Sequence, residues 1–518
     1  MSINAIDFYK SGHRPQYPEL TQMVYSNFTP RSSRLAPVLE KYYDGKVVFV
    51  GLQIFNVDFL INEFSRKFFK KDKSKAVTRY KRRMDNALGK DAVSVDHIEA
   101  LHDLGYIPLE IKALPEGSLV NIKVPMFTVK NTLSEFFWLV NYIESVISAE
   151  VWKPCTTATI AFQYRKIMEH YAELTGANKE TIIFQCHDFS FRGMSGRHDA
   201  KVSGIGHLLS FCGTDNVLSI DACEDFYGAD VTKELVGASV PATEHSVMCM
   251  GGKDDEIGTF KRLITELYPS GIVSIVSDTW DFWKVITEFT VELKDEILNR
   301  IPNELGLAKT VFRPDSGCPI KILTGYTEDE LIIAESPDGI ESYTCKETGK
   351  SLSYEECFGA VQCLWDIFGG TYTDKEFKTL HERVGLIYGD SITLDRADKI
   401  LQRLADKGFS SDNVVFGVGS YTYQYITRDS FGFAMKATAG IVDGEFREIY
   451  KDPKTDSGTK KSAKGLIRIE EEDGEFVLYD QQTEQQEQQG CLKVVFKDGK
   501  MYNENTLSSM RKTLLDRL

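Results

Sequence analysis

The sequence contains no run of about 20 apolar residues, which is the length that a helix needs to cross a membrane. The segment Met1–Asp7 has no basic part followed by an apolar one, so it does not read as a secretory signal. The ten cysteines include no C-x-x-C pair, and this usage indicates a reducing compartment rather than a disulfide framework or a zinc site. We therefore expect a cytoplasmic protein with no membrane partner.

Positive charge is also scarce, because the net charge is −15. The basic, helical-looking stretch Arg66–Arg83 is interpreted as a solvated helix face, and nucleic acid is not expected as a partner. No G-x-x-x-x-G-K-[ST] loop is present, which argues against a P-loop nucleotide enzyme. His97-x-Glu99 is not followed by P-C-x-x-C, so a zinc deaminase is not supported and no protein-bound metal site is predicted.

What the sequence does have is length for two cores, with 518 residues and an ordinary apolar content of 42%. Three segments differ in pattern: residues 1–155 read as α+β, residues 156–425 as an α/β barrel, and residues 426–518 as β-rich. Because the two end segments share a character that the middle lacks, we expect them to form one discontinuous α+β domain packed against the barrel.

Local patterns refine this division. Alternating apolar residues in Leu109–Ala113 and Val120–Val124, separated by a turn, predict an antiparallel pair. Three Asp-Gly pairs near the C-terminus predict hairpins at Asp443-Gly444, Asp473-Gly474 and Asp498-Gly499. Residues 325–375 are interpreted as a surface insertion, and Gln481–Gln489 as a solvated, mobile loop.

The middle segment repeats a short apolar run that ends in Gly, Asp, Ser, Arg or His. The runs are Thr181–Gln185, Gly237–Pro241, Ile272–Val276, Thr310–Phe312, Val384–Ile387 and Val414–Phe416. Separated by helical segments such as Thr157–Leu174 and Leu394–Lys407, they predict buried parallel strands of an irregular, TIM-like α/β barrel. Residues past the carboxyl ends of such strands meet at one mouth, where we expect a pocket for an anionic, phosphate-bearing substrate.

The sharpest motif at a strand end is Arg313-Pro314-Asp315-Ser316-Gly317. Arg313 offers a planar fork for a phosphate group, and Asp315 offers a carboxylate for a hydroxyl group or a metal-bound water. Gly389-Asp390-Ser391 and Gly417–Ser420 follow two later strands, and backbone N–H groups at such turns make anion sites.

Other strand ends carry aromatic, acidic and titratable side chains. Phe189 could stack on a planar heterocycle, Asp215 supplies a carboxylate, and Glu244-His245 forms a titratable pair. Further along the chain a loose basic cluster could complete an anion pocket, including that of a partner subunit; it comprises Arg428, Lys436, Lys451, Lys460, Lys461 and Lys464.

Taken together, these residues resemble the nicotinamide phosphoribosyltransferases, a family of type II phosphoribosyltransferases. The matching motifs run through nearly the whole chain: Asp7–His13, Gln16–Pro18, Ile111–Gly117, His187–Gly193, Gly213–Asp215, Val240–Ser246, Ser277-Asp278, Arg313–Gly317, Gly389-Asp390, Thr427–Asp429 and Lys451–Pro453. The resemblance implies synthesis of nicotinamide mononucleotide and pyrophosphate from nicotinamide and 5-phosphoribosyl-1-pyrophosphate, in NAD salvage. It also implies a head-to-tail homodimer with shared active sites, Mg²⁺ bound mainly through pyrophosphate, and ATP as a co-substrate.

The resemblance also assigns roles. The pyridine ring would stack between Phe189 and Tyr9 of the partner subunit, and Asp215 would accept a hydrogen bond from the carboxamide. The phosphoribosyl group would be held by Arg192, Arg313, Asp315, Gly389, Asp390 and Gly419. Phosphates or pyrophosphate would be bound by Asp7, Arg428, Lys436, Lys451 and Lys460, and the substrate-binding set also includes Ser274, Val240 and Ser420. ATP would phosphorylate His245, which Glu244 and Asp278 would position or tune, and hydrolysis of the phosphohistidine would drive synthesis forward.

Three other interpretations stay open at this point. A nicotinate phosphoribosyltransferase shares the fold group, but Asp215 would repel nicotinate by roughly 4 kcal/mol at ~4 Å and an effective dielectric of ~20. A non-catalytic protein that kept the fold would have no need of Arg313, Asp315, Asp390, Arg428 and His245 together. A phosphate-binding barrel enzyme such as an aldolase or isomerase needs a Lys or Glu at a strand end, and no convincing one is found.

Overall fold

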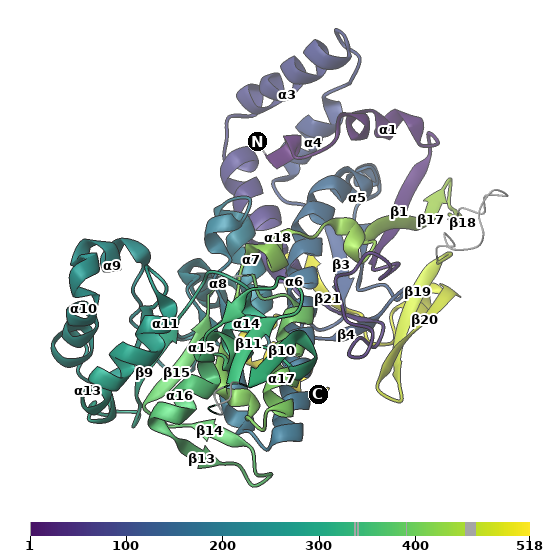
Figure 1. Cartoon of the computed structure of the whole chain (residues 1–518). Helices are drawn as coiled ribbons and strands as arrows, with labels where there is room; N and C mark the ends of the chain where they lie inside the picture. The colour runs from purple at the N-terminus through teal and green to yellow at the C-terminus, as the bar shows by residue number, and fades with distance from the viewer. Residues whose placement is uncertain (1, 336–337, 339–340, 390, 451–462) are drawn as a thin grey trace.

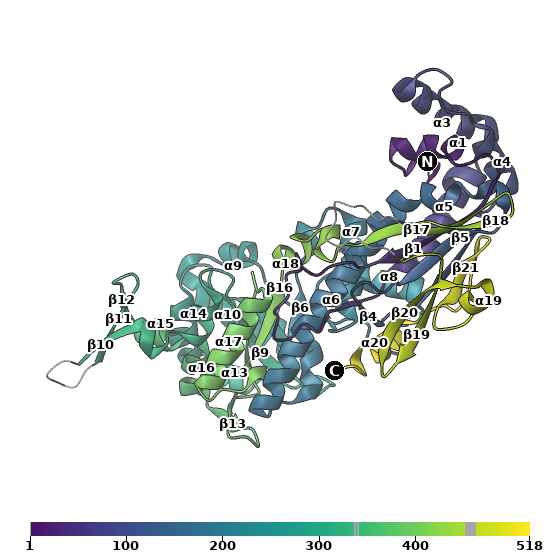
Figure 2. The ribbon, with the colours of Figure 1, turned by 90° about the vertical axis from the view of Figure 1, so that its right-hand side faces the viewer.

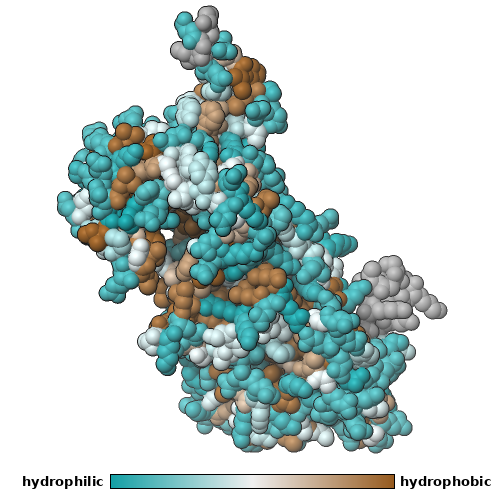
Figure 3. Space-filling view, turned by 90° about the horizontal axis from the view of Figure 1, so that it is seen from below, coloured by the Kyte–Doolittle hydropathy of each residue, from teal (hydrophilic) through white to brown (hydrophobic). Residues whose placement is uncertain are grey.

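The computed structural model describes residues 2–335, 338, 341–389, 391–450 and 463–518 (Figure 1). Two sheets of different kinds organise the chain, a parallel one from the middle of the sequence and an antiparallel one from its two ends. Among the described residues, none of the helices combines the length and apolar character that crossing a membrane requires. Seen from below, the surface is mostly hydrophilic, with hydrophobic residues gathered beside a hollow (Figure 3).

The parallel sheet has six strands, and every neighbouring pair runs parallel. In spatial order they are β7 (Gly213–Thr214), β6 (Cys186–Asp188), β16 (Val414–Val418), β15 (Val384–Tyr388), β9 (Ala308–Arg313) and β8 (Gly271–Val276). The sheet curves as a half-barrel whose two edges are approached by one segment, because Ala238 bridges Gly213 and Ala242 bridges Ser274. The expected α/β class with parallel strands is confirmed.

Two of the six predicted runs differ from expectation. Thr181–Gln185 is wrong as a strand, because the chain forms a 3₁₀ turn over Lys179–Phe184 and the strand begins only at Cys186. The Asn178 side chain caps this turn by accepting from the Glu180 N–H at 3.0 Å, which favours helical over extended backbone. Gly237–Pro241 forms no strand and makes only the single bridge at Ala238.

Helices flank the parallel sheet and supply much of its buried core. The predicted helix Thr157–Leu174 is confirmed within α6 (Glu144–Thr175), and Leu394–Lys407 is confirmed as α17 (Leu394–Asp406), which ends one residue earlier. One buried cluster joins side chains between Ile160 and Ile426. The other helices of this part are α7 (Arg197–Leu208), α8 (Val217–Tyr227), α9 (His245–Gly251), α10 (Glu256–Arg262), α11 (Phe282–Lys284), α12 (Thr290–Glu292), α13 (Lys294–Leu298), α14 (Pro319–Thr324), α15 (Tyr354–Phe358), α16 (Ala360–Phe368) and α18 (Ser420–Gln424).

The antiparallel sheet combines strands from both ends of the chain. Its spatial order is β18 (Glu445–Glu448), β17 (Ala434–Val442), β1 (Thr21–Thr29), β5 (Phe127–Asn131), β3 (Leu109–Ala113), β21 (Lys493–Lys497) and β22 (Lys500–Met501). A second buried cluster joins side chains from Ile3 to Cys155 with others from Phe431 to Phe496. The helices of the two end segments are α1 (His13–Gln16), α2 (Leu52–Ile54), α3 (Lys73–Leu88), α4 (Asp96–Leu104), α5 (Leu139–Tyr142), α19 (Glu484–Glu487) and α20 (Leu507–Leu515).

In the two end segments, the predicted hairpins are confirmed, but one predicted strand pairing is not. All three Asp-Gly hairpins form, and in each both turn residues have positive φ, for example 53° at Asp443 and 73° at Gly444. The expected pairing of Leu109–Ala113 with Val120–Val124 is wrong. The first run pairs with β5 and β21, whereas β4 (Leu119–Asn121) pairs with β2 (Lys46–Val48).

The Gln/Glu-rich segment Gln481–Gln489 is not the solvated loop that its composition predicts. It contains the end of β20 (Glu475–Gln482) and the short helix α19, and Glu487 is only 3% exposed. The Glu487 carboxylate forms a buried ion pair with the Lys112 ammonium at 2.7 Å. The expected surface insertion at 325–375 is confirmed only in part. Strands β10 (Leu331–Glu335), β11 (Glu341–Cys345) and β12 (Ser351–Leu352) project from the surface (Figure 2), but Ala360 and Leu364 of α16 are buried in the core beside the parallel sheet.

Candidate functional site

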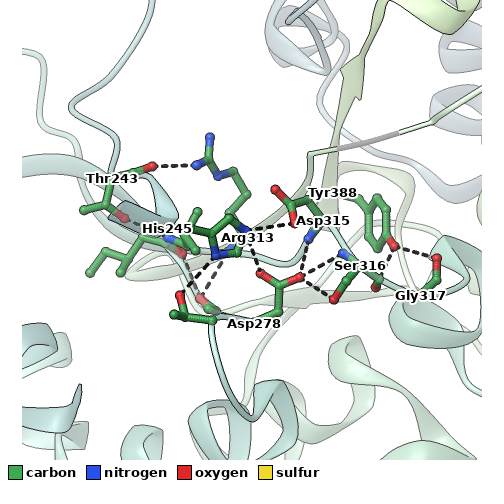
Figure 4. Close-up of polar contacts among 12 residues, drawn as sticks. Thr243, His245, Asp278, Arg313, Asp315, Ser316, Gly317 and Tyr388 are labelled. Carbon is green, nitrogen blue, oxygen red and sulfur yellow. Dashed lines mark hydrogen bonds and ion pairs between the residues drawn. The ribbon is translucent and has the colours of Figure 1, made fainter. Parts of the chain in front are cut away.

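A histidine and two aspartates meet at the carboxyl ends of neighbouring parallel strands (Figure 4). His245 Nε2 lies 3.2 Å from Asp315 Oδ1 and 3.8 Å from Asp278 Oδ1. His245 Nδ1 lies 3.2 Å from the Thr279 hydroxyl oxygen. Asp278 and Asp315 follow β8 and β9, while His245 is the first residue of α9. The topology of the sheet therefore brings together residues that are up to 70 positions apart.

Asp278 is the best-anchored member of this group. Its Oδ2 accepts hydrogen bonds from the Asp315 N–H at 2.9 Å, the Ser316 N–H at 2.8 Å and the Ser316 hydroxyl at 2.6 Å. Its side chain is 3% exposed, and its Oδ1 accepts no hydrogen bond from any residue that the structure describes. Asp278 thus holds the Asp315 turn in place with one oxygen and presents the other to His245.

Arg313 ends β9 and lies partly buried beside this group. Its Nη2 donates to the Thr243 carbonyl at 2.5 Å, and its Nε has no hydrogen-bond partner within the described part of the chain. Burial lowers the pKa of the Arg313 guanidinium from its ordinary value, whereas the nearby Asp315 and Asp215 carboxylates act in the opposite direction. Since the ordinary pKa of an arginine lies far above neutrality, the guanidinium stays cationic at neutral pH.

A second group lies at the ends of β6 and β7. Asp215 Oδ1 accepts a hydrogen bond from the Ser239 hydroxyl at 2.6 Å and contacts His187 Nε2 at 2.9 Å. Burial by itself raises the pKa of this carboxyl, but the contacts with His187 and Ser239 outweigh it, so the pKa lies below its ordinary value. The Phe189 ring lies beside the His187 ring, with centroids 4.7 Å apart. An aromatic ring and an ionised carboxylate are therefore neighbours at this end of the sheet.

Glycines allow close approach around Phe189 and at the neighbouring turns. A Cβ on Gly417 would lie 2.6 Å from Phe189 Cδ2, so no larger residue fits between this strand and the ring. A Cβ on Gly193 would lie 2.1 Å from the Ser420 hydroxyl oxygen, so the turn that carries Arg192 packs against the start of α18. The Gly389 N–H donates to the Pro314 carbonyl at 3.0 Å. This hydrogen bond links the turn after β15 to the Arg313–Gly317 motif.

Three other predicted residues, Ser274, Val240 and Glu244, lie close to these groups in the fold. Ser274 is buried in β8, where its backbone bonds to Pro241 and Thr243. Val240 is half-buried in the segment that bridges the sheet edges. Glu244 is exposed before α9, and its carboxylate accepts from the Ser246 hydroxyl rather than from His245.

Four of the remaining predicted residues lie in the described part of the chain, away from these groups. Tyr9 is 59% exposed and packs against His13, and both views of the ribbon draw α1 far from α9 (Figures 1 and 2). Asp7 bonds to Ser145 in the same region. Arg428 is exposed and pairs with Asp429 at 3.3 Å, and Lys436 is exposed on β17. Asp390, Lys451 and Lys460 lie outside the described residues.

Sequence reasoning missed several hydroxyl residues that hold the site together. Thr279 contacts His245, Ser239 donates to Asp215, and the Thr243 hydroxyl accepts from the Val276 N–H at 2.9 Å. The Tyr388 hydroxyl donates to the Ser316 carbonyl at 2.9 Å. Thr279 and Tyr388 lie at or within three residues of a strand end, and Ser239 and Thr243 lie in or next to segment 238–242, which bridges the two sheet edges. Their position near strand ends is the sequence feature that could have identified them.

The fold and these groups define a phosphate-handling α/β enzyme class, in which cations, carboxylates and glycine turns share the carboxyl edge of a parallel sheet. The chain belongs to the nicotinate phosphoribosyltransferase (NAPRTase) family, whose model matches residues 184–500. A nicotinamide phosphoribosyltransferase of Acinetobacter baylyi is 60% identical over 516 residues, covering 100% of this chain and 97% of that protein. A nicotinamide phosphoribosyltransferase of Mycoplasma genitalium is 32% identical, covering 90% of this chain and 94% of that protein.

Among solved structures, the nicotinate-nucleotide pyrophosphorylase from Pyrococcus furiosus is similar, with a TM-score of 0.54 and 13% identity. The similarity covers 100% of this chain and 95% of that one. At this identity the likeness supports the fold alone, and it agrees with the family assignment made from sequence.

Proposed function

We propose that this enzyme transfers the phosphoribosyl group of 5-phosphoribosyl-1-pyrophosphate to nicotinamide, giving nicotinamide mononucleotide and pyrophosphate in NAD salvage. The reaction is supported by 60% identity, over the whole chain, to a protein named nicotinamide phosphoribosyltransferase. Within the family, the observation that carries the choice of nicotinamide over nicotinate is the ionised Asp215, which contacts His187, as the Phe189 ring also does.

Asp215 selects the base by charge and hydrogen bonding. Its Oδ1 already accepts from Ser239 and contacts His187, which leaves Oδ2 to accept from the carboxamide NH₂ of nicotinamide. The carboxylate of nicotinate has no such donor and would face a like charge. We assign Phe189 to one face of the pyridine ring, with Val240 and Ser274 nearby.

The phosphoribosyl group would be held by the turns around Arg313. Arg313 and Arg192 supply positive charge, Asp315 a carboxylate for ribose hydroxyls, and Gly389, Asp390, Gly419 and Ser420 the close-approaching turns. Displacement of pyrophosphate from C1 passes through a cation-like ribosyl centre, so the enzyme mainly positions reactants and stabilises leaving-group charge. No strong general base is required, because the pyridine nitrogen carries its own lone pair.

Mg²⁺ fits the carboxylate oxygens of Asp278 and Asp315, which are the hard ligands that it prefers. When bound, mainly through pyrophosphate, it would neutralise charge on the leaving group. These two residues would hold the cation on the protein side, and Arg313 would complement it.

We further propose that ATP phosphorylates His245. The contact with Thr279 fits an Nδ1–H that donates to the hydroxyl, while Nε2 lies 3.2 Å from Asp315 Oδ1. Asp315 would take the Nε2 proton before the Nε2 lone pair attacks. The Nε2–P bond would form as the bond between the γ-phosphorus and the bridging oxygen breaks, and ADP would leave with that electron pair. Hydrolysis of the phosphohistidine would release phosphate and pull synthesis forward. Asp278 would position His245, and Glu244, the preceding residue, would tune it.

The site is proposed to be completed by a second copy of the chain. Asp7 and Tyr9 lie away from Phe189 within one chain, so a head-to-tail homodimer would supply them from the partner subunit. Arg428, Lys436, Lys451 and Lys460 would serve phosphates at the same junction.

The two buried clusters support a division of the chain into two domains. One domain comprises residues 156–425, an irregular barrel closed by segment 238–242, and the other comprises residues 1–155 with 426–518. Ten cysteines, none in a disulfide, support a cytoplasmic location.

The test is product formation from 5-phosphoribosyl-1-pyrophosphate and Mg²⁺ with equal nicotinamide and nicotinate, with and without ATP. We expect nicotinamide mononucleotide in excess, and more of it with ATP for the native enzyme but not for H245N. Preferential formation of nicotinate mononucleotide would refute the assignment of Asp215. An equal response of H245N to ATP would refute the assignment of His245.

A further inference from the structure

The group of His245, Asp278 and Asp315 has a property that phosphate transfer alone does not explain. Two carboxylate oxygens face the same imidazole nitrogen, and one of them, Asp278 Oδ1, is buried and accepts no hydrogen bond from any described residue. A buried, unpartnered carboxylate oxygen is costly unless a cation neutralises it. The group therefore leaves room for a ligand of positive charge.

The distances match those between donor atoms around a small metal ion. Bonds of about 2.0–2.1 Å in tetrahedral geometry place neighbouring donors roughly 3.4 Å apart. His245 Nε2 lies 3.2 Å from Asp315 Oδ1 and 3.8 Å from Asp278 Oδ1, and one donor atom from each of the three residues lies within 4.8 Å of the others. Small side-chain adjustments would seat one cation among them.

The surrounding hydrogen bonds are those that orient metal ligands. A ligating histidine donates its other ring N–H to a nearby oxygen, and Thr279 stands in that position. A ligating carboxylate is held by donors at its second oxygen, as Asp278 is by the Asp315 N–H, the Ser316 N–H and the Ser316 hydroxyl. Two of the three donor groups are thus oriented before any ligand binds.

The chemistry of the donors selects the cation. One imidazole nitrogen with two carboxylates suits Zn²⁺ and its first-row neighbours better than Mg²⁺, which prefers oxygen ligands and keeps its waters. We propose that His245, Asp278 and Asp315 bind a Zn²⁺-class cation in the substrate-free enzyme, and that this cation occupies the nitrogen which ATP would phosphorylate. The second half of this proposal rests on the proposed phosphorylation of His245. Such a cation would share Asp278 and Asp315 with the proposed Mg²⁺ but would also bind His245, and it would act as an inhibitor.

Co²⁺ is the probe, because its visible spectrum reports coordination without any activity measurement. Full-length enzyme, freed of metal with a chelator, is titrated with Co²⁺ alone and then with Zn²⁺ as competitor. His198 provides a matched control, because its side chain is 47% exposed against 45% for His245 and it faces a single carboxylate, Glu150. The variants are H245Q, D278N and H198Q, each checked for a native unfolding transition.

We expect one equivalent of Co²⁺ to bind, to give ligand-field bands and to be displaced by Zn²⁺. The affinity should fall at least about tenfold in H245Q and in D278N, and stay within about twofold in H198Q. Absence of binding, or equal affinity in H245Q, would overturn the site. If D278N fails to fold, H245Q alone decides, since its exposed side chain is not part of the core.

The consequence for phosphorylation has its own readout. Enzyme loaded with one equivalent of Zn²⁺ is given MgATP labelled at the γ-phosphorus, and label on His245 should fall at least about tenfold compared with unloaded enzyme. Equal labelling would overturn the inhibitory half of the proposal. Co²⁺ binding without any label in unloaded enzyme would instead refute the ATP coupling and leave the metal site standing.

Discussion

Replacing Asp215 by Asn tests the basis of substrate choice most directly. The substitution keeps shape and hydrogen-bonding capacity but removes the charge that would repel nicotinate. Two unit charges ~4 Å apart at an effective dielectric of ~20 repel by about 4 kcal/mol. The Asp215 side chain is 44% exposed, so solvent screening reduces the expected effect to roughly 1–2 kcal/mol. That corresponds to a change of about 5- to 30-fold in the preference for nicotinamide.

The assay compares kcat/KM for nicotinamide and for nicotinate in the native enzyme, D215N and the exposed-surface control D225N. We expect the ratio to fall in D215N, mainly because nicotinate improves, and to be unchanged in D225N. Because the pKa of Asp215 lies below its ordinary value, its charge is constant between pH 6 and 8, and so should be its effect on the ratio. An unchanged ratio in D215N would refute electrostatic exclusion as the origin of specificity.

Three further predictions concern packing and buried charge. G417A should raise KM for nicotinamide by about tenfold in steady-state kinetics, because the new Cβ displaces the Phe189 ring. K112M should lower the free energy of unfolding in urea by about 3–5 kcal/mol, because the buried Glu487 carboxylate loses its partner cation. K112M/E487M should recover most of the lost stability. Burial raises the pKa of Glu256 to about 7, so the folded protein keeps a proton that the unfolded chain releases above pH ~4.5. Glu256 should therefore lower the free energy of unfolding by roughly 1–3 kcal/mol as the pH rises from ~4.5 to ~7, measured as the difference between the native enzyme and E256Q.

Each of these has an outcome that contradicts it. An unaltered KM in G417A would mean that the Phe189 ring does not contact the base. Equal stability of K112M and native enzyme would mean that the Lys112–Glu487 pair contributes nothing, and a parallel pH dependence in E256Q would assign the titration to another group.

The parallel strands could be predicted because their signal is local. Ile272–Val276 and Val384–Ile387 are almost wholly apolar, as strands covered on both sides are, and Ser277-Asp278 and Gly389 follow them closely. In a parallel sheet, the residues that follow the strands lie at one edge. The contact between Asp278 and Asp315 could therefore be predicted from the order of strands and turns in the sequence.

Pairing in the antiparallel sheet could not be predicted in the same way. The alternation in Leu109–Ala113 establishes a strand, but its partners β5 and β21 are a nearby strand and one almost 400 residues later. Composition failed for a related reason at Gln481–Gln489, where a polar segment is anchored by one buried residue, Glu487, whose partner Lys112 is equally distant in sequence. Long-range pairs of this kind leave no periodic trace.

The residues expected in the site separate into two sets for a topological reason. Phe189, Asp215 and Asp315 follow parallel strands, and parallel strands direct their carboxyl ends to one edge. Tyr9 and Lys436 belong instead to the part of the chain built on the antiparallel sheet, whose strands alternate in direction and present their ends at both sides. Nothing in that sheet directs Tyr9 toward the edge that carries Phe189, and Figure 2 draws α1, which follows Tyr9 closely in sequence, well away from β6. A ring-stacking role for Tyr9 would therefore need a second copy of the chain, which is why we propose a shared site.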